Sequence, residues 1–219
     1  MTRSPAAVVH LDESCLGNVR DGGTPGGAGG LIEVRTGRGI QRLDFALAEP
    51  ATTNNRMALR GAAAVLDLLS GKGKRLRVLL VSDSEYLVRG MNEWVTGWKA
   101  RGWRRKAGPV ENLDLWQLVD TAAGRHDCQW AWVRGHHGHP KNEYADHLAV
   151  QAARTGAGTG GAVPSGFGEW LAARRADGQY LDYDPDAAFD NLARPLAAGQ
   201  RVPLAADGRR AIPGGGGHV

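Results

Sequence analysis

The sequence has little of what defines several large classes of protein. It contains two cysteines, Cys15 and Cys128, in 219 residues, too few for a disulfide framework. It has no run of about 18 consecutive apolar residues, the length that crosses a membrane. Residues 1–7 lack the long apolar segment of a secretory signal. We therefore expect a cytoplasmic protein without membrane association, in which both cysteines are small buried side chains.

The composition is that of an ordinary soluble globular protein, at 42% hydrophobic and 23% charged residues. The length allows one domain of about 150 residues with a sizeable core, plus an appendage. Residues 155–219 form that appendage, because they contain thirteen glycines and scattered prolines. We expect a domain over 1–154 and a glycine-rich, loosely ordered C-terminal extension over 155–219, with possible short helices at 167–175 and 186–193.

Positive charge is concentrated in the first part of the chain. The net charge is +4, yet residues 155–219 carry seven acidic and six basic side chains. Residues 1–154 therefore hold 21 basic and 16 acidic side chains. An excess of positive charge on the main domain suits a polyanionic partner without proving one.

Hydrophobic patterning predicts an alternation of strands and helices in residues 1–154. Strands are expected at 8–12, 31–34, 41–47, 76–81 and 128–133. Helices are expected at 56–69, 85–91, 113–123 and 142–154. The seven glycines within 17–30 predict a loop. This order of elements predicts a single α/β domain with a mixed sheet.

Two carboxylates follow apolar runs and a third lies in the last predicted helix of the domain. Asp12 and Asp83 each end a predicted strand, and Asp146 lies near the start of the helix over 142–154. Polar residues at strand ends are where open α/β sheets form their sites. Oxygen ligands without cysteine suit Mg²⁺ or Mn²⁺ rather than zinc. The alternative is that these are ordinary surface aspartates.

Residues 92–112 combine tryptophans with basic side chains. The tryptophans are Trp94, Trp98 and Trp103, and the basic residues are Lys99, Arg101, Arg104, Arg105 and Lys106. One interpretation is that the tryptophans belong to the core and the charges form a solvated face. The other is a substrate-binding protrusion, because lysine and arginine neutralise phosphates and tryptophan offers a rigid surface for sugars.

Several motifs, in this order and spacing, carry a resemblance that covers residues 8–153. They are Leu11-Asp12-Glu13-Ser14-Cys15-Leu16-Gly17-Asn18, Thr52-Thr53-Asn54-Asn55-Arg56-Met57, Ser82-Asp83-Ser84-Glu85-Tyr86 and Trp132-Val133-Arg134-Gly135-His136-His137-Gly138-His139-Pro140, followed by Asn142-Glu143 and Asp146. Together they resemble bacterial type 1 ribonuclease H. The resemblance implies a ribonuclease H-like fold with a five-stranded mixed sheet flanked by helices. It also implies a monomer that cuts the RNA strand of RNA/DNA hybrids with two Mg²⁺ (or Mn²⁺) ions.

The resemblance assigns roles to individual residues. It implies that Asp12 bridges both metal ions, that Asp83 binds the second and that Asp146 binds the one that activates water. It implies that His136, in a mobile loop, shuttles protons or helps the product leave, which suits a side chain that titrates near neutral pH. A zinc site formed by neighbouring loop histidines is a poor alternative, because such close spacing gives no defined tetrahedral geometry.

The resemblance also implies a nucleic-acid surface in two parts. Asparagine amides can recognise base edges and the 2′-OH. The alternative role of asparagines at such positions is turn formation and helix capping, which is compatible with binding. The groove-contacting residues are Asn18, Thr53, Asn54 and Asn55, and the basic protrusion is Trp94, Trp98, Lys99, Arg101, Arg104, Arg105 and Lys106.

The sequence departs from the family pattern at its metal ligands. Ala58 stands where the family has a glutamate that binds one metal. The nearest acid further along that helix, Asp67, is nine residues on, or roughly 13 Å along the axis. Glu13 replaces a glycine, but strand alternation points it to the opposite face from Asp12, which argues against direct replacement. Glu85 stands where the family often has glutamine.

Three hypotheses follow from this altered site. The first is a ribonuclease H weakened at its second metal, with Glu13 or Glu85 compensating. The second is a catalytically impaired module that binds hybrid or double-stranded RNA without cutting it. The third is an interaction domain tethered by the glycine-rich extension.

Overall fold

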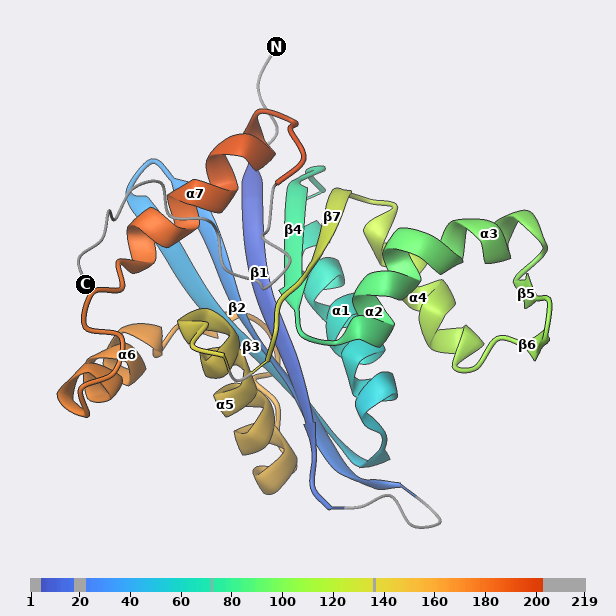
Figure 1. Cartoon of the computed structure of the whole chain (residues 1–219), viewed down its shortest axis with the longest axis horizontal. Helices are drawn as coiled ribbons and strands as arrows, with labels where there is room; N and C mark the ends of the chain where they lie inside the picture. Colours follow the sequence, from blue (N-terminus) through green and yellow to red (C-terminus); the bar gives the residue numbers. More distant parts are fainter. Residues whose placement is uncertain (1–4, 18–22, 72, 136, 203–219) are drawn as a thin grey trace, which may run out of the picture.

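A six-stranded mixed sheet forms the centre of the fold, in the order β7-β4-β1-β2-β3-β8 (Figure 1). The computed structural model describes residues 5–17, 23–71, 73–135 and 137–202. The strands are β1 (Ala6–Cys15), β2 (Thr24–Thr36), β3 (Gly39–Thr52), β4 (Arg77–Ser82), β7 (Asp127–Trp132) and β8 (Val163–Pro164). β1, β2 and β3 are antiparallel, whereas β4 runs parallel to β1 and β7 parallel to β4. The predicted mixed sheet is therefore confirmed, with β8 as a short sixth strand beside β3.

Helices cover both faces of this sheet. They are α1 (Asn54–Ser70), α2 (Glu85–Arg89), α3 (Val95–Ala100), α4 (Leu113–Ala123), α5 (Pro140–Thr155), α6 (Phe167–Ala176) and α7 (Pro185–Ala197). A π-helical segment, η1 (Gly90–Trp94), joins α2 to α3, and a small hairpin of β5 (Arg104–Arg105) and β6 (Gly108–Pro109) follows. Figure 1 shows α1 and α4 on one side of the sheet and α5, α6 and α7 on the other. Among the described residues, no helix combines the length and apolar character needed to cross a membrane.

Strand alternation divides β1 between two cores. Ala7, Val9 and Leu11 are buried with the apolar side chains of α1 and α4. Ala6 and Val8 are buried with those of α7. Odd-numbered residues of β1 therefore face α1, and even-numbered residues face the opposite layer.

The glycine-rich segment before residue 31 is largely strand, which corrects the prediction of a loop over 17–30. β2 begins at Thr24, and its glycines allow α5 to lie directly on the sheet. A Cβ atom on Gly29 would stand 2.4 Å from the Ala149 nitrogen and 2.5 Å from the Ala145 oxygen, both backbone atoms of α5. These glycines are needed for close approach between helix and strand rather than for a turn.

The C-terminal extension contains the two short helices expected at 167–175 and 186–193, as α6 and α7. It differs from the expected loose order because residues 163–202 are folded against the domain. Phe189, Leu192 and Leu196 of α7 are buried against Val8 and Val81 of the sheet. α6 contributes a second small core with Tyr144 of α5. The apolar residues of α7 recur at helical spacing and cover a sheet face that would otherwise be exposed, which explains why the high glycine content did not leave this segment loose. Residues 203–219 lie outside the described part of the chain.

Candidate active site

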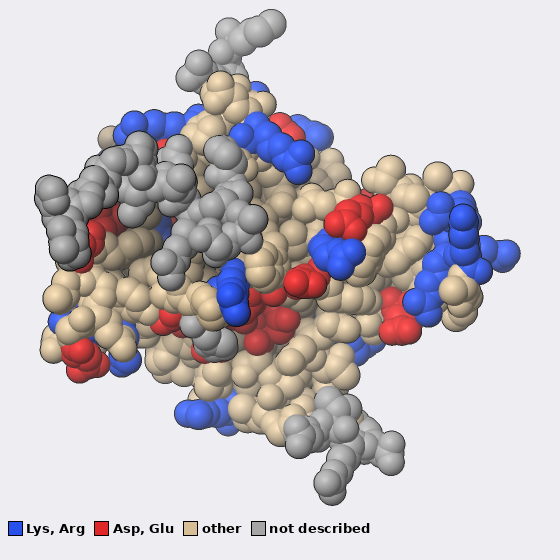
Figure 2. Space-filling view, viewed as in Figure 1, with Lys and Arg blue, Asp and Glu red and all other residues tan. Residues whose placement is uncertain are grey.

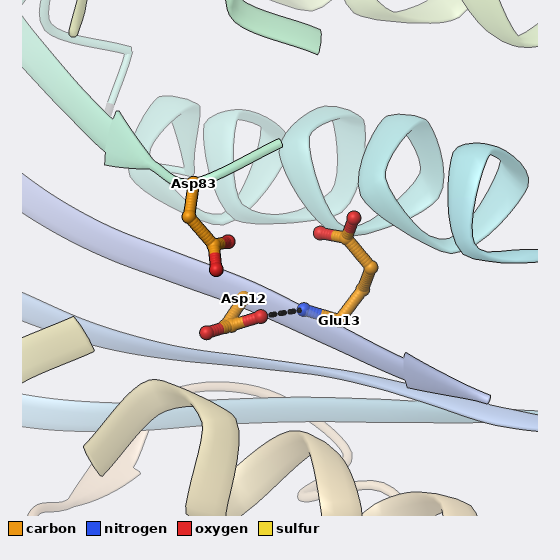
Figure 3. Close-up of side chains that lie close together, drawn as sticks. All are labelled: Asp12, Glu13 and Asp83. Carbon is orange, nitrogen blue, oxygen red and sulfur yellow. Dashed lines mark hydrogen bonds between the residues drawn. The ribbon is translucent and has the colours of Figure 1, made fainter. Parts of the chain in front are cut away.

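Parallel pairing of β1 and β4 sets two aspartates beside each other. Leu11 pairs with Ser82, so the next residues, Asp12 and Asp83, occupy equivalent positions on neighbouring strands. Asp83 directly follows β4, as predicted. Asp12 lies inside β1 rather than at its end, because β1 continues to Cys15. The two apolar strands thus deliver both carboxylates to one place on the sheet (Figure 3).

Asp12 is the most enclosed carboxylate of this group. Its side chain accepts hydrogen bonds from the Glu13 backbone N–H at 2.7 Å and from Asn142 Nδ2 at 2.9 Å. Only 5% of the residue is exposed. Burial, followed by the negative charges of Asp83, Glu13 and Asp146, raises the pKa of Asp12 to about 9. In the metal-free protein the acidic cluster therefore holds protons more tightly than isolated carboxylates do.

Glu13 joins the cluster from the other face of the sheet. Oxygen atoms of Asp12, Glu13 and Asp83 all lie within 4.8 Å of one another. Burial and the charge of Asp83 raise the pKa of Glu13 to about 8. Its Oε2 is buried and accepts no hydrogen bond from the described residues. A buried acceptor without a partner is costly, so this oxygen is suited to a cation.

The position of Glu13 corrects the inference that strand alternation excludes it from the site. Alternation does separate the two side chains, since Figure 3 shows Glu13 on the side of α1 and Asp12 on the side of α5. Ala58 of α1 belongs to the core on the same face as Glu13, and it is fully buried. A glutamate at position 58 would come from this side of the sheet. Glu13 therefore supplies a carboxylate from the face where Ala58 lacks one.

α5 brings two further polar side chains to Asp12. Asn142 donates to Asp12, and Asp146 lies one helical turn further on, close enough for its charge to raise the pKa of Asp12. The approach of α5 to Gly29 of β2 makes this possible, because Gly29 is the partner of Asp12 in the β1–β2 pair. The structure thus sets Asp12 and Asp83 within 4.8 Å of each other, with Asp146 near enough for its charge to act on Asp12. Glu85 lies exposed at the start of α2 instead.

The segment between β7 and α5 passes over Asp83. A Cβ atom on Gly135 would stand 2.2 Å from Asp83 Oδ2, so a larger residue here would collide with the carboxylate. Trp132 Nε1 donates to the Asp83 carbonyl oxygen at 3.0 Å and so fixes the main chain at Asp83. His136, the predicted loop histidine, lies outside the described residues. No described histidine joins the acidic cluster.

The histidine that closes this segment is structural. His139 precedes α5 and packs against His10, with ring centroids 5.3 Å apart. Burial lowers the pKa of His139 to about 4. This side chain is neutral at physiological pH and belongs to the packing beneath the site.

The residues predicted to contact the hybrid groove lie at the start of α1. The Thr53 hydroxyl caps the helix by accepting from the Arg56 backbone N–H. Asn54 and Asn55 are exposed in the first turn. A helix N-terminus presents backbone N–H groups and partial positive charge, which favours phosphate oxygens nearby. Asn18 lies outside the described residues.

The predicted protrusion combines an aromatic base with a basic rim. Trp94 and Trp98 are half-buried and pack in a ladder with Tyr86 and Trp116. The basic side chains are exposed: Lys99, Arg101, Arg104, Arg105 and Lys106. Figure 2 shows basic side chains gathered at the end of the molecule that carries the β5–β6 hairpin, and acidic ones near the middle of the same face. The tryptophans therefore build a core that carries an exposed basic rim, and the binding of substrate by this rim stays a prediction.

The acidic cluster fits a divalent cation by its donor set. It offers carboxylate oxygens only, and it includes a buried oxygen without a hydrogen-bond donor. Hard oxygen ligands suit Mg²⁺ and Mn²⁺. A bound cation would also offset the burial and the mutual repulsion that hold the pKa values of Asp12 and Glu13 above their ordinary range.

Comparisons with known proteins converge on one family. The family model described as "RNase H" matches residues 4–154. Ribonuclease HI of Caulobacter vibrioides is 42% identical over 152 residues, which are 69% of this chain and 95% of that protein. The ribonuclease H of Pseudomonas savastanoi is 44% identical over 147 residues, 67% of this chain and 91% of that protein.

One solved structure matches nearly the whole chain. It is LC9-RNase H1, described as a type 1 RNase H with the type 2 active-site motif. It is 44% identical, with a TM-score of 0.79 over 96% of this chain and 100% of that one. The RNase H domain of PFV, at 20% identity and a TM-score of 0.57 over 69% of this chain and 96% of that one, shows the fold alone.

Proposed function

The chain belongs to the ribonuclease H family, and we propose that it hydrolyses the RNA strand of RNA/DNA hybrids at a divalent-metal site built by Asp12, Glu13, Asp83 and Asp146. The observation that carries the proposal is the position of Glu13. Its carboxylate lies with those of Asp12 and Asp83, on the face of the sheet where Ala58 stands. The missing glutamate of α1 is therefore replaced from β1, and the expected weakening at the second metal is compensated within the site.

A related structure supports a departure of this kind. LC9-RNase H1 is described as combining a type 1 enzyme with the type 2 active-site motif. A type 1 fold thus accommodates an active-site motif other than its own. The high identity of this chain to LC9-RNase H1 favours an active rather than a decayed site here.

The residues of this chain prepare the site for two Mg²⁺ or Mn²⁺ ions. Asp12, Glu13, Asp83 and Asp146 would hold these ions, which would supply charge stabilisation to the phosphodiester and activate water for attack. Asn142 fixes one oxygen of Asp12, and the Glu13 backbone N–H fixes the other. Burial keeps the carboxylates in low dielectric, where they attract a cation more strongly than exposed groups do.

The substrate side has two components. We assign Asn54 and Asn55 to the minor groove and to the 2′-OH, which distinguishes RNA from DNA, and their exposure at the start of α1 supports this assignment. The exposed arginines and lysines of the protrusion bind phosphates further along the duplex. His136 is assigned to proton transfer or product release by its family position.

The experiment is a hybrid-cleavage assay in Mg²⁺ and in Mn²⁺ on five variants beside the native chain. Asp12→Asn should abolish cleavage. Glu13→Gln keeps the size of the side chain but removes its charge, and it should lower kcat by about 10-fold to 100-fold. Ala58→Glu alone should gain nothing, because it inserts a second acid into a fully buried position.

The informative variant is the exchange Glu13→Gly with Ala58→Glu. It moves the carboxylate from β1 to α1, and it should recover part of the activity that Glu13→Gly loses. If the native chain binds hybrid but does not cut it in either metal, the protein is a binding module and the proposed activity is wrong. If Glu13→Gln cuts as well as the native chain, Glu13 has no part in the site.

A further inference from the structure

One carboxylate of α5 connects this helix to the segment directly before it and to the distant C-terminal extension. Glu143 Oε1 accepts a hydrogen bond from the backbone N–H of Gly138, in the segment before α5, at 3.1 Å. Glu143 Oε2 accepts one from the Tyr180 hydroxyl, in the C-terminal extension. Glu143 stands between Asn142 and Asp146 on the same helix. The extension is therefore bonded to the helix that completes the acidic cluster.

A second junction joins the extension to the first turn of α5. Lys141 is buried, and its Nζ contacts both carboxylate oxygens of Glu33, at 2.9 Å and 2.7 Å. The same Nζ donates to the carbonyl oxygen of Pro185, the first residue of α7, at 3.0 Å. A buried ammonium group needs every one of its protons bonded. The extension supplies one of these acceptors and so completes the environment of Lys141.

The backbone of Tyr180 is held in an unusual conformation. Its φ is 54°, in the left-handed region that large side chains rarely adopt. Its ring stacks on Trp170, with centroids 6.1 Å apart and an angle of 25° between the rings. Strain of this kind persists only where surrounding contacts impose it, and it is often associated with function. Here those contacts direct the hydroxyl to Glu143.

We propose that Tyr180 is a positioning residue for hybrid cleavage, which holds α5 and the segment before it in place through Glu143. The inference rests on the proposed function. α5 carries Asn142, which bonds Asp12, and Asp146. The segment before α5 carries Gly135, which lies against the Asp83 carboxylate. One hydroxyl of the extension thereby steadies both sides of the acidic cluster.

The test is Tyr180→Phe, which removes the hydroxyl and keeps the ring on Trp170. We expect kcat to fall by about threefold to tenfold, the effect of one hydrogen bond lost from a positioned group. KM for the hybrid should change little, because Tyr180 is not assigned to the substrate surface. The amide proton of Gly138 should exchange faster with solvent in the ¹⁵N-labelled variant, a readout that does not depend on activity.

Asp190→Asn is the matched control. Asp190 forms an ion pair that ties α7 to Arg35 of β2. Among the described residues, its carboxylate pairs with Arg35 and Arg194 and not with α5 or the segment before it. The substitution Asp190→Asn loosens the contact between α7 and β2, away from α5, so it should lower the unfolding temperature without lowering kcat. Glu143→Gln should reduce kcat as Tyr180→Phe does, and the double variant should add little to either single one.

The outcomes separate this inference from the proposed function. If the native chain cleaves hybrid and folded Tyr180→Phe matches its kcat and its Gly138 exchange rate, the inference is overturned and the function stands. If Tyr180→Phe does not fold, Glu143→Gln alone decides by the same two measurements. If kcat falls equally in Asp190→Asn, the extension acts only through global stability and Tyr180 has no positioning role. If the native chain does not cleave hybrid, both are overturned.

Discussion

Glu13 and Asp83 bring carboxylate oxygens within 4.8 Å of each other from the neighbouring strands β1 and β4. Glu13 extends from β1 on the side of α1 and Asp83 extends from the end of β4, yet both carboxylates lie close to Asp12 (Figure 3). Three buried or half-buried acids at this distance repel one another as anions. The arrangement is stable without metal only if protons remain on part of the cluster, and this has a measurable consequence.

The metal-free protein should lose stability as the pH rises from 7 to 9. Asp12 and Glu13 have folded-state pKa values of about 9 and about 8, against ordinary values of 3.8 and 4.5. The folded chain therefore holds protons that the unfolded chain has released, so the stabilisation present at low pH is lost as pH rises through the folded values. Unfolding by urea in EDTA at pH 7, 8 and 9 measures this loss. His10 and His139 do not contribute to the change between pH 7 and pH 9, because burial lowers their folded pKa values below the ordinary value and both side chains are already neutral.

The control for this pH dependence is Asp12→Asn, compared with Asp67→Asn. Asp12→Asn removes the titrating group and should be more stable than the native chain at pH 9 in EDTA. Asp67 is exposed beside Arg125, so its substitution should leave the slope unchanged. Added Mg²⁺ should stabilise the native chain more at pH 9 than at pH 7. A metal-free stability that rises over this window would contradict the folded-state pKa values.

The contact between β2 and α5 predicts that Gly29→Ala damages both stability and activity. The added Cβ would meet backbone atoms of α5 at 2.4 Å and 2.5 Å, so the helix must shift. Overpacking of this kind costs about 1–3 kcal/mol of unfolding free energy. Because α5 carries Asn142 and Asp146, kcat for hybrid should fall as well.

Gly30→Ala is the matched control for that substitution. Gly30 lies next to Gly29 but faces the other side of the sheet, and its nearest neighbour to an added Cβ is the His10 oxygen at 3.3 Å. We expect a change in unfolding free energy within about 1 kcal/mol and native kcat. Equal effects of the two alanines on kcat would mean that the position of α5 does not matter to the site.

The acidic cluster and the glycines beside it show where sequence reasoning succeeded and where it failed. Apolar runs before Asp12 and Asp83 predicted their strands. Their proximity was predicted because polar residues at strand ends of an open α/β sheet tend to gather at one site. The glycines near Gly29 predicted a loop, since glycine is read first as a turn former. Only the packed helix reveals that the missing side chains make room for α5. Glu13 was misjudged for a related reason, because alternation gives the face of a side chain but not the space available on that face.

The basic protrusion predicts a specific salt dependence. Replacing Arg104, Arg105 and Lys106 with alanine removes three exposed cations from the β5–β6 hairpin. Hybrid affinity should fall. The negative slope of log K against log salt should become less steep by about 2–3, since each phosphate contact contributes about 0.9 to its magnitude. A fluorescence-anisotropy titration at several salt concentrations, on an Asp12→Asn background that prevents cutting, measures both.

A charge-matched control separates phosphate contact from net charge. Replacing Arg38, Lys74 and Arg125 with alanine removes the same charge from exposed positions away from the hairpin. This variant should keep nearly native affinity and slope. If the two triple variants weaken binding equally, attraction is diffuse and the hairpin is not a binding surface.

The extension illustrates the limit of composition as a predictor. Thirteen glycines in residues 155–219 suggested a loosely ordered segment, yet Phe189 of α7 is fully buried against the sheet. A short helix at 186–193 was expected, but the glycine-rich background favoured a loose segment over one whose Phe189, Leu192 and Leu196 pack on the sheet. Composition averages over a segment, whereas burial depends on a few residues on one helical face.

Phe189→Ala should therefore destabilise the whole protein rather than the extension alone. Removing a fully buried phenylalanine leaves a cavity between α7 and the sheet, at a cost of about 3–5 kcal/mol. Leu181→Ala is the control, since Leu181 is 64% exposed and its loss should change stability by no more than about 0.5 kcal/mol. Because Val8 and Val81 of the central strands pack in the same core as Phe189, urea unfolding should remain a single transition. An early separate transition, with the rest of the chain as stable as before, would mean that the extension folds independently of the nuclease domain.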